Sequence, residues 1–300
     1  MAKIATGLRN ALGLRAASGA ATGLSARILA EGRGWSVSDV ICDAGPADRP
    51  FEEQHSEIRV ALIGAGTFQY HTSAGRALMS PGSLMLGSAG QFFECAHDHG
   101  TGDRCLAFGY SPEYFEGIAS DAGLRFPKAA FQVPSLPPLR KLSPILARAC
   151  AALLSQSVAG STRWEELSLE LAVRTLELVS GRPPSPKEPS STDMARITMA
   201  IKAVERDLSG LSVRSLAANV GLSPYHFLRT FERLTGVTPH QYILRTRLTE
   251  AAVRLSIERG KVIDILLDCG FADVSNFNRM FRSEFGVSPR AYRAERACRT

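Results

Sequence analysis

The chain has 300 residues, of which 45% are hydrophobic and 21% are charged. This composition is that of an ordinary globular protein, and it excludes a wholly disordered, collagen-like or coiled-coil chain. The formal net charge is +6, and its distribution is uneven: residues 193–300 hold 17 Lys and Arg against 11 Asp and Glu, whereas residues 1–192 hold 18 of each. A basic C-terminal part joined to a neutral N-terminal part indicates that the basic part binds a polyanion such as nucleic acid.

The N-terminal 30 residues carry four basic residues and no acidic one. Residues 1–33 are therefore predicted to be a disordered leader, although their composition is also that of a transit-type presequence. No run of about 18 apolar residues occurs, so no membrane-spanning helix is expected. The six cysteines are too scattered for a disulfide framework, which favours the reducing cytoplasm as the compartment.

Residues 34–110 have the pattern of short strands separated by Gly, Pro and Ser. Several short strands at close spacing predict a sandwich or a barrel. Helical periodicity follows and predicts helices that pack on the strands or pair with a second copy of the chain. Residues 34–180 are thus predicted to form a β-rich domain for sensing or dimerisation. The expected strands include 58–63, 67–71, 83–86, 91–95 and 104–110, and the expected helices cover 139–153 and 161–178.

A proline-rich segment, residues 181–192, divides the chain. It contains four prolines, three serines and one threonine, and no apolar residue. Segments of this kind form extended spacers and cannot continue a helix. Because the charge asymmetry begins at the same place, we predict a linker here and a separate domain over residues 193–300.

Residues 193–300 contain an internal repeat. Six residues in the first copy recur in the second at a spacing of fifty. Each copy has the pattern of a short helix, a turn containing Gly221 or Gly270, and a second helix, which is the sequence form of a helix-turn-helix. The matched pairs are Phe227/Phe277, Arg229/Arg279, Phe231/Phe281, Gly236/Gly286, Pro239/Pro289 and Tyr242/Tyr292.

The second helix of each copy is predicted over residues 224–235 and 274–285. At about 100° per residue, the phenylalanines share a buried face and polar residues occupy the opposite face. An exposed helix face that carries Arg and Asn suits the DNA major groove, where Arg can donate two hydrogen bonds to guanine. The outward-facing residues include Tyr225, Leu228, Arg229, Ser275, Asn276, Arg279 and Arg282.

These motifs carry a family resemblance. LAANVGLSPYHFLRTFERLTGVTP and GFADVSNFNRMFRSEFGVSPRAYR resemble the DNA-binding domain of the AraC/XylS family of bacterial transcription regulators. The resemblance covers about residues 197–292 and implies two helix-turn-helix units joined by a long helix over residues 239–257, with base-reading roles for Tyr225, Leu228, Arg229, Ser275, Asn276, Asn278 and Arg279. Leu266 stands where the family has a small alanine, and Leu228 is apolar at an outward position.

The fold class that follows is a multidomain α+β protein, with an N-terminal β-rich barrel and a C-terminal all-α double helix-turn-helix. Family members commonly carry a cupin-like N-terminal barrel that binds a small effector or mediates dimerisation, and residues 34–180 resemble that arrangement. The resemblance implies a cytoplasmic homodimer that binds an operator in double-stranded DNA. RNA polymerase is left open as a further partner, and the effector and the direction of regulation stay unassigned.

A second cluster of chemically active residues lies in the β-rich part. Cys95, His97, His99 and Cys105 are residue types that bind zinc or another transition metal, and His55 or His71 could join them. The spacing matches no structural zinc pattern, so an exposed histidine-rich hairpin is the simpler interpretation. Three alternatives stay open: a metal-responsive regulator, a regulator that senses through the Cys95 and Cys105 thiols, and a cupin enzyme fused to a DNA-binding module. No cofactor is required, and no catalytic residues are assigned.

Overall fold

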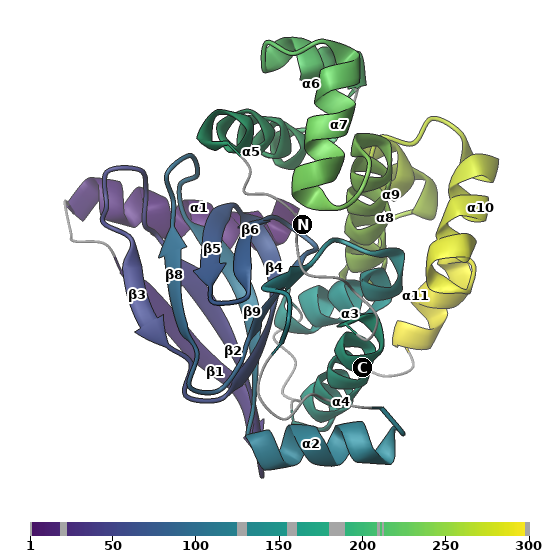
Figure 1. Cartoon of the computed structure of the whole chain (residues 1–300). Helices are drawn as coiled ribbons and strands as arrows, with labels where there is room; N and C mark the ends of the chain where they lie inside the picture. The colour runs from purple at the N-terminus through teal and green to yellow at the C-terminus, as the bar shows by residue number, and fades with distance from the viewer. Residues whose placement is uncertain are drawn as a thin grey trace.

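The computed structural model describes residues 2–18, 23–124, 131–154, 161–179, 190–208, 211 and 213–297. Its N-terminal part contains two antiparallel sheets that face each other, and its C-terminal part is helical (Figure 1). The strands of the described residues are β1 Leu24–Gly32, β2 Trp35–Cys42, β3 Phe51–Gln54, β4 Ile58–Gly66, β5 Phe68–Thr72, β6 Gly75–Met79, β7 Leu84–Gly87, β8 Phe92–Ala96, β9 Asp103–Tyr110 and β10 Ser135–Leu136.

The larger sheet has the strand order β1-β2-β9-β4-β7-β10, and the smaller has the order β3-β8-β5-β6. Side chains of a strand alternate between the two faces of its sheet. In β9, Cys105 and Ala107 therefore join the core between the two sheets, whereas Leu106 and Phe108 face the helices. The interior between the sheets is filled by side chains that include Phe68 and Tyr70.

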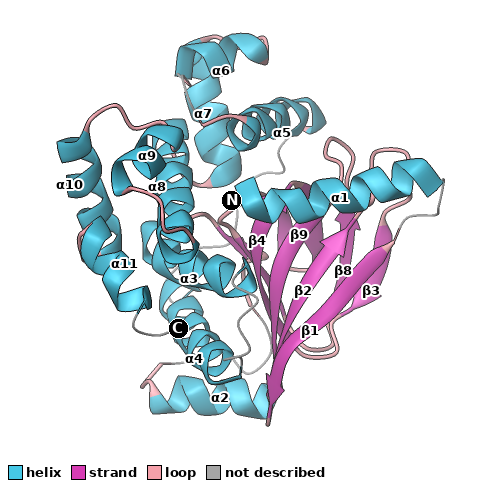
Figure 2. Ribbon diagram, turned by 180° about the vertical axis from the view of Figure 1, so that it is seen from behind, coloured by secondary structure: helices cyan, strands magenta, loops and turns pink. Residues whose placement is uncertain are grey.

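Helices cover the other face of the larger sheet (Figure 2). Trp164 of α4 lies beside Phe108 of β9, with ring centroids 6.4 Å apart. Tyr110 donates a hydrogen bond from its hydroxyl to the carbonyl of Ser168, at 2.8 Å. The helices of this part are α1 Ala2–Ser18, α2 Pro112–Asp121, α3 Ser143–Leu154 and α4 Ser161–Val179, with a 3-10 turn at Arg140–Leu142.

The prediction of a disordered leader is wrong for most of residues 1–33. Helix α1 runs across one end of the strands of the larger sheet (Figure 2), and strand β1 follows it. Ile4 and Leu8 are only 1% and 5% exposed, and the Arg104 guanidinium donates to the Ile4 carbonyl at 3.1 Å. These apolar residues recur every fourth position, but Ala and Gly surround them and dilute the amphipathic pattern.

Two helix-turn-helix units form the C-terminal part. Ser223 caps α7 and Asp273 caps α10 by accepting hydrogen bonds from backbone amides of the first turn, as is usual at helix N-termini. Both helices end at a glycine with a positive φ, 72° at Gly236 and 82° at Gly286. The helices are α5 Ser191–Arg206, α6 Val213–Asn219, α7 Pro224–Thr235, α8 Pro239–Ile257, α9 Val262–Asp268, α10 Val274–Phe285 and α11 Pro289–Ala297.

The two parts are packed together. Helix α3 lies along α8 (Figure 1), and one apolar core contains residues of α3, α8 and α10. Polar contacts accompany this core: Arg245 of α8 donates to the Pro138 carbonyl at 2.8 Å, and the Gly66 amide donates to Glu205 of α5 at 3.0 Å. The C-terminal helices therefore rest against the β-rich part rather than standing apart from it.

Many of the predicted helices and strands are present in the structure. Helices α7, α8 and α10 have the predicted bounds, and the five predicted strands correspond to β4, β5, β7, β8 and β9. Strands β1, β2, β3, β6 and β10 were not among the predicted strands. Most of the predicted linker lies outside the described residues, and α5 begins at its last two positions, Ser191 and Thr192. None of the described helices combines the length and the apolar character needed to cross a bilayer.

Candidate nucleic-acid interface

The predicted base-reading residues of the second unit lie on the exposed face of α10. Phe277 and Phe281 are fully buried on the opposite face, as the helical spacing requires. Arg279 donates from Nη2 to Asn276 Oδ1 at 3.0 Å, so these two side chains form a pair one helical turn apart. Five exposed residues of this face are predicted DNA contacts: Ser275, Asn276, Asn278, Arg279 and Arg282.

An open groove borders this face. Its lining combines three of the predicted residues, Asn278, Arg279 and Arg282, with two basic residues that the sequence did not single out, Lys261 and Arg290. Lys261 precedes α9, and Arg290 lies in the first turn of α11. Helix-wheel reasoning on α10 alone misses both, because they come from neighbouring elements. The groove therefore gathers four cationic side chains beside the exposed face of α10.

The first unit presents a smaller described surface. Leu228 is 37% exposed and Arg229 is also exposed, while Phe227 and Phe231 are buried beneath them. Tyr225 lies in the first turn of α7, and its side chain is outside the described part of the chain. Ala217 and Leu266 occupy equivalent positions in the first helices of the two units, and both are buried, at 0% and 1% exposed.

The four predicted metal ligands do not come together as one site. Cys95 and Cys105 are buried between the sheets, where burial raises the pKa of each thiol well above its ordinary value. His99 lies at the surface, with Nε2 3.1 Å from Ser191 Oγ. High thiol pKa values leave little reactive thiolate, so this geometry does not favour sensing through Cys95 and Cys105.

His55 also lies away from these residues. Its Nε2 is 2.7 Å from the Tyr70 hydroxyl, and its ring stacks on Phe93 at a centroid distance of 4.1 Å. Burial lowers the pKa of His55 to about 4, so the imidazole is neutral at physiological pH. These contacts are those of a histidine that belongs to the packed interior.

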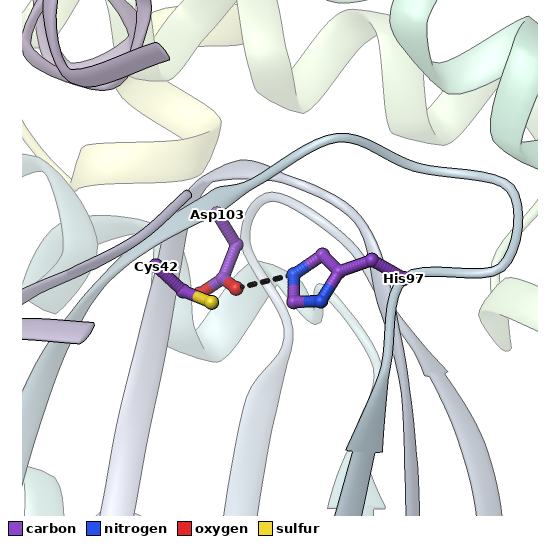
Figure 3. Close-up of side chains that lie close together, drawn as sticks. All are labelled: Cys42, His97 and Asp103. Carbon is purple, nitrogen blue, oxygen red and sulfur yellow. Dashed lines mark hydrogen bonds and ion pairs between the residues drawn. The ribbon is translucent and has the colours of Figure 1, made fainter. Parts of the chain in front are cut away.

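His97 does meet other ligand-type side chains. Figure 3 shows its imidazole beside the carboxylate of Asp103 and the thiol of Cys42, and its Nε2 is 2.9 Å from Asp103 Oδ1. One ligand atom from each of the three residues lies within 4.8 Å of the other two, and all three residues are buried. Burial raises the pKa of Asp103, and burial together with Asp103 raises that of Cys42 to about 12. This cluster could not be predicted from the sequence, because Cys42 is more than fifty residues away from His97 and Asp103.

The paired units on one helical scaffold define the class of the protein as a double helix-turn-helix protein. A family model described as a helix-turn-helix domain matches residues 216–295. The chain is 35% identical over 131 residues to the transcriptional activator RhaS of Escherichia fergusonii, a match that covers 43% of this chain and 44% of RhaS. It is 32% identical over 84 residues to the probable transcription factor PqrA of Proteus vulgaris, covering 28% of this chain and 69% of PqrA.

Solved structures are also similar to part of this chain. One is a transcriptional regulator with an AraC-type DNA-binding domain from Chromobacterium violaceum, at 30% identity and a TM-score of 0.33, covering 36% of this chain and 97% of that one. Another is the DNA-binding domain of AdpA in complex with a target DNA, at 30% identity and a TM-score of 0.34. The match covers 35% of this chain and 95% of that one. The chain belongs to the AraC family of DNA-binding transcription regulators. Its match spans less than half the length of RhaS.

Proposed function

We propose that the protein regulates transcription by binding a specific double-stranded DNA site with α7 and α10. The exposed face of α10 carries the proposal, because Asn276, Asn278 and Arg279 are of the residue types that read base edges in the major groove. Arg282 on that face and Lys261 and Arg290 beside it supply charge for phosphate contacts, which provide affinity without sequence preference.

The division of labour between the two units follows from their side chains. Arg229 is the counterpart of Arg279 in the repeat, and Leu228 offers an apolar surface to a thymine methyl group. The first unit is thus proposed to read fewer hydrogen-bonding positions than the second. RhaS is named as a transcriptional activator, which supports activation as the regulatory outcome.

The β-rich part is proposed to regulate this DNA-binding unit. Its support is the shared apolar core of α3, α8 and α10, through which a change in the N-terminal part reaches a recognition helix. A small effector, dimerisation through the N-terminal part, RNA polymerase as a partner and a cytoplasmic location belong to the same proposal. The chain's relatives are transcription regulators, so no catalytic step is proposed.

Selection from a random duplex library by the full chain tests the proposal. The expected enriched sites contain two short conserved blocks whose centres are about one helical turn, roughly 10 base pairs, apart. Binding to an enriched site should weaken steeply with salt, whereas the preference for that site over random DNA should persist. Retention of the whole library without enrichment would contradict sequence-specific recognition and leave only general affinity for polyanions.

A further inference from the structure

Three buried side chains from distant parts of the sequence meet near one end of the β-rich part. Cys42 ends β2, His97 follows β8, and Asp103 begins β9. Their exposed fractions are 2%, 5% and 5%, and the ligand atoms lie within 4.8 Å of one another (Figure 3). Sulfur, imidazole nitrogen and carboxylate oxygen are the three ligand types of protein zinc sites.

We infer that Cys42, His97 and Asp103 bind one divalent transition-metal ion of the zinc class. Tetrahedral coordination with the usual bond lengths requires separations of about 3.3–3.6 Å between ligand atoms. His97 Nε2 and Asp103 Oδ1 are 2.9 Å apart, which is just below this range, and no two of the three ligand atoms are more than 4.8 Å apart. Shifts of about 1 Å therefore bring the three atoms to the separations that a metal ion requires. No backbone rearrangement is needed for movements of this size.

Charge balance also suits a dication. A thiolate and a carboxylate together neutralise one divalent ion, which removes the cost of burying either anion alone. Two arginines beside the cluster have acidic partners: Arg104, next to Asp103 in the sequence, binds Asp39 at 2.8 Å, and Arg15, whose charge acts on Cys42, binds Asp48 at 2.7 Å. Thr67 adds a further polar atom nearby, since its buried hydroxyl has no hydrogen-bond partner within the described part of the chain. Thr67 stands between Gly66, which pairs with Asp103 in the sheet, and Phe68, whose ring lies 5.7 Å from that of His97.

The site is connected to the first helix of the DNA-binding part. His99, two residues after His97, contacts α5 twice: its Nε2 lies 3.1 Å from Ser191 Oγ, and its carbonyl accepts from Lys202 Nζ at 3.3 Å. Next to Asp103 in the sheet, Gly66 donates to Glu205 of α5 at 3.0 Å. Helix α5 packs in turn on α6 and α7. Metal occupancy therefore fixes the segment 97–103 that holds α5, and it regulates the affinity of the first unit for DNA. This second step rests on the proposed function.

Zinc titration of the metal-free full chain, in competition with a chromophoric chelator, tests the site. The expected result is one zinc ion per chain and a higher unfolding temperature when zinc is bound. Cobalt as a probe should give a thiolate-to-metal charge-transfer band in the near ultraviolet. Cys42→Ser should abolish that band and weaken zinc binding at least about tenfold. Asp103→Asn, which keeps a hydrogen-bond partner for His97 and so protects the fold, should weaken binding similarly.

Cys105→Ser and His99→Gln are the matched controls, and both should bind zinc as the wild type does. Zinc binding that is absent, or equally strong in Cys42→Ser, overturns the site. Loss of binding in Cys105→Ser but not in Cys42→Ser assigns the metal to the other cysteine and also overturns it. DNA affinity measured with and without zinc separates the two proposals. A chain that binds DNA but no zinc refutes only the metal site, whereas a chain that binds zinc but no DNA refutes only the proposed function.

Discussion

Arg279 is the residue of α10 on which we expect sequence recognition to depend most. It is exposed, and its Nη2 is held by Asn276 Oδ1 at 3.0 Å, which presents the guanidinium in a defined direction. Arg279→Ala is expected to cost about 1–3 kcal/mol of binding free energy on the selected site and to relax the preference at one base position. Competition binding against single-base variants of that site measures both effects.

Arg290→Ala is the matched control for Arg279→Ala. It removes the same charge from the same groove but lies outside α10. We expect it to weaken binding to selected and random DNA equally and to reduce the salt dependence. If Arg279→Ala behaves in the same way as Arg290→Ala, Arg279 contacts phosphate and does not read a base.

Glu205 makes the stability of the chain depend on pH. Burial raises the pKa of its carboxyl, while the Gly66 amide, Lys202 and Arg9 oppose the shift. The folded state therefore binds more protons than the unfolded state between the ordinary pKa and the raised one, so the free energy of unfolding falls as pH rises through that window. Glu205→Gln should remove this fall and raise the free energy of unfolding at pH 7, because the amide is neutral and its oxygen still accepts the hydrogen bond from the Gly66 amide.

Denaturant unfolding of the wild type and Glu205→Gln across pH 4–8 measures the difference. Glu116→Gln, at an exposed position on α2, is the control and should leave the pH profile unchanged. A Glu205→Gln variant that is less stable than the wild type at pH 7 would show that the ionised carboxylate stabilises the junction between α5 and β4.

Helices α7 and α10 both end at a glycine, but the two glycines have different neighbours. Gly236 and Gly286 both adopt a positive φ, which costs about 1 kcal/mol for a residue with a Cβ. A Cβ added at Gly286 would meet nothing within 4 Å, whereas one at Gly236 would lie 2.6 Å from Pro137 Cβ. Gly286→Ala should thus destabilise by about 1 kcal/mol, and Gly236→Ala by clearly more, since it also displaces Pro137 of the β-rich part.

Thermal and denaturant unfolding of the two glycine variants give the comparison. The double variant Gly236→Ala/Pro137→Gly lacks the Cβ of Pro137 and should therefore recover part of the loss. Equal destabilisation by both single variants would mean that the Pro137 contact is absent in solution.

Helices bounded by local sequence signals could be predicted from the sequence, whereas strands whose conformation depends on pairing with distant strands could not. Caps, turns and the phenylalanine repeat defined α7, α8 and α10 from sequence, because each signal lies within a few residues of the helix it bounds. Strands β1 and β2 were missed because long-range pairing decides their conformation: β1 pairs with β2, and β2 pairs with β9. The cluster of Cys42, His97 and Asp103 was missed for the same reason: β2 and β9 pair Cys42 with Asp103 directly.

At the scale of the whole molecule, Glu284 joins α10 to the β-rich part. Its carboxylate accepts from the Ser143 hydroxyl at 2.5 Å and lies 3.8 Å from Arg245 and 3.6 Å from Arg140. The side chain is only 8% exposed. Because removal of Glu284 leaves the largely buried Arg245 without its acidic partner, Glu284→Ala should cost about 2 kcal/mol of unfolding free energy.

The same variant tests whether the two parts unfold as one unit. The apolar core that α3, α8 and α10 share predicts a single cooperative transition for the wild type. In Glu284→Ala, hydrogen exchange should increase at the start of α3 and the end of α10, while the interior of the β-rich part stays protected. Glu295→Ala, an exposed change on α11, should alter stability by less than about 0.5 kcal/mol. If the two variants exchange alike, the carboxylate of Glu284 does not hold the parts together, and the apolar core with its other polar contacts accounts for their docking.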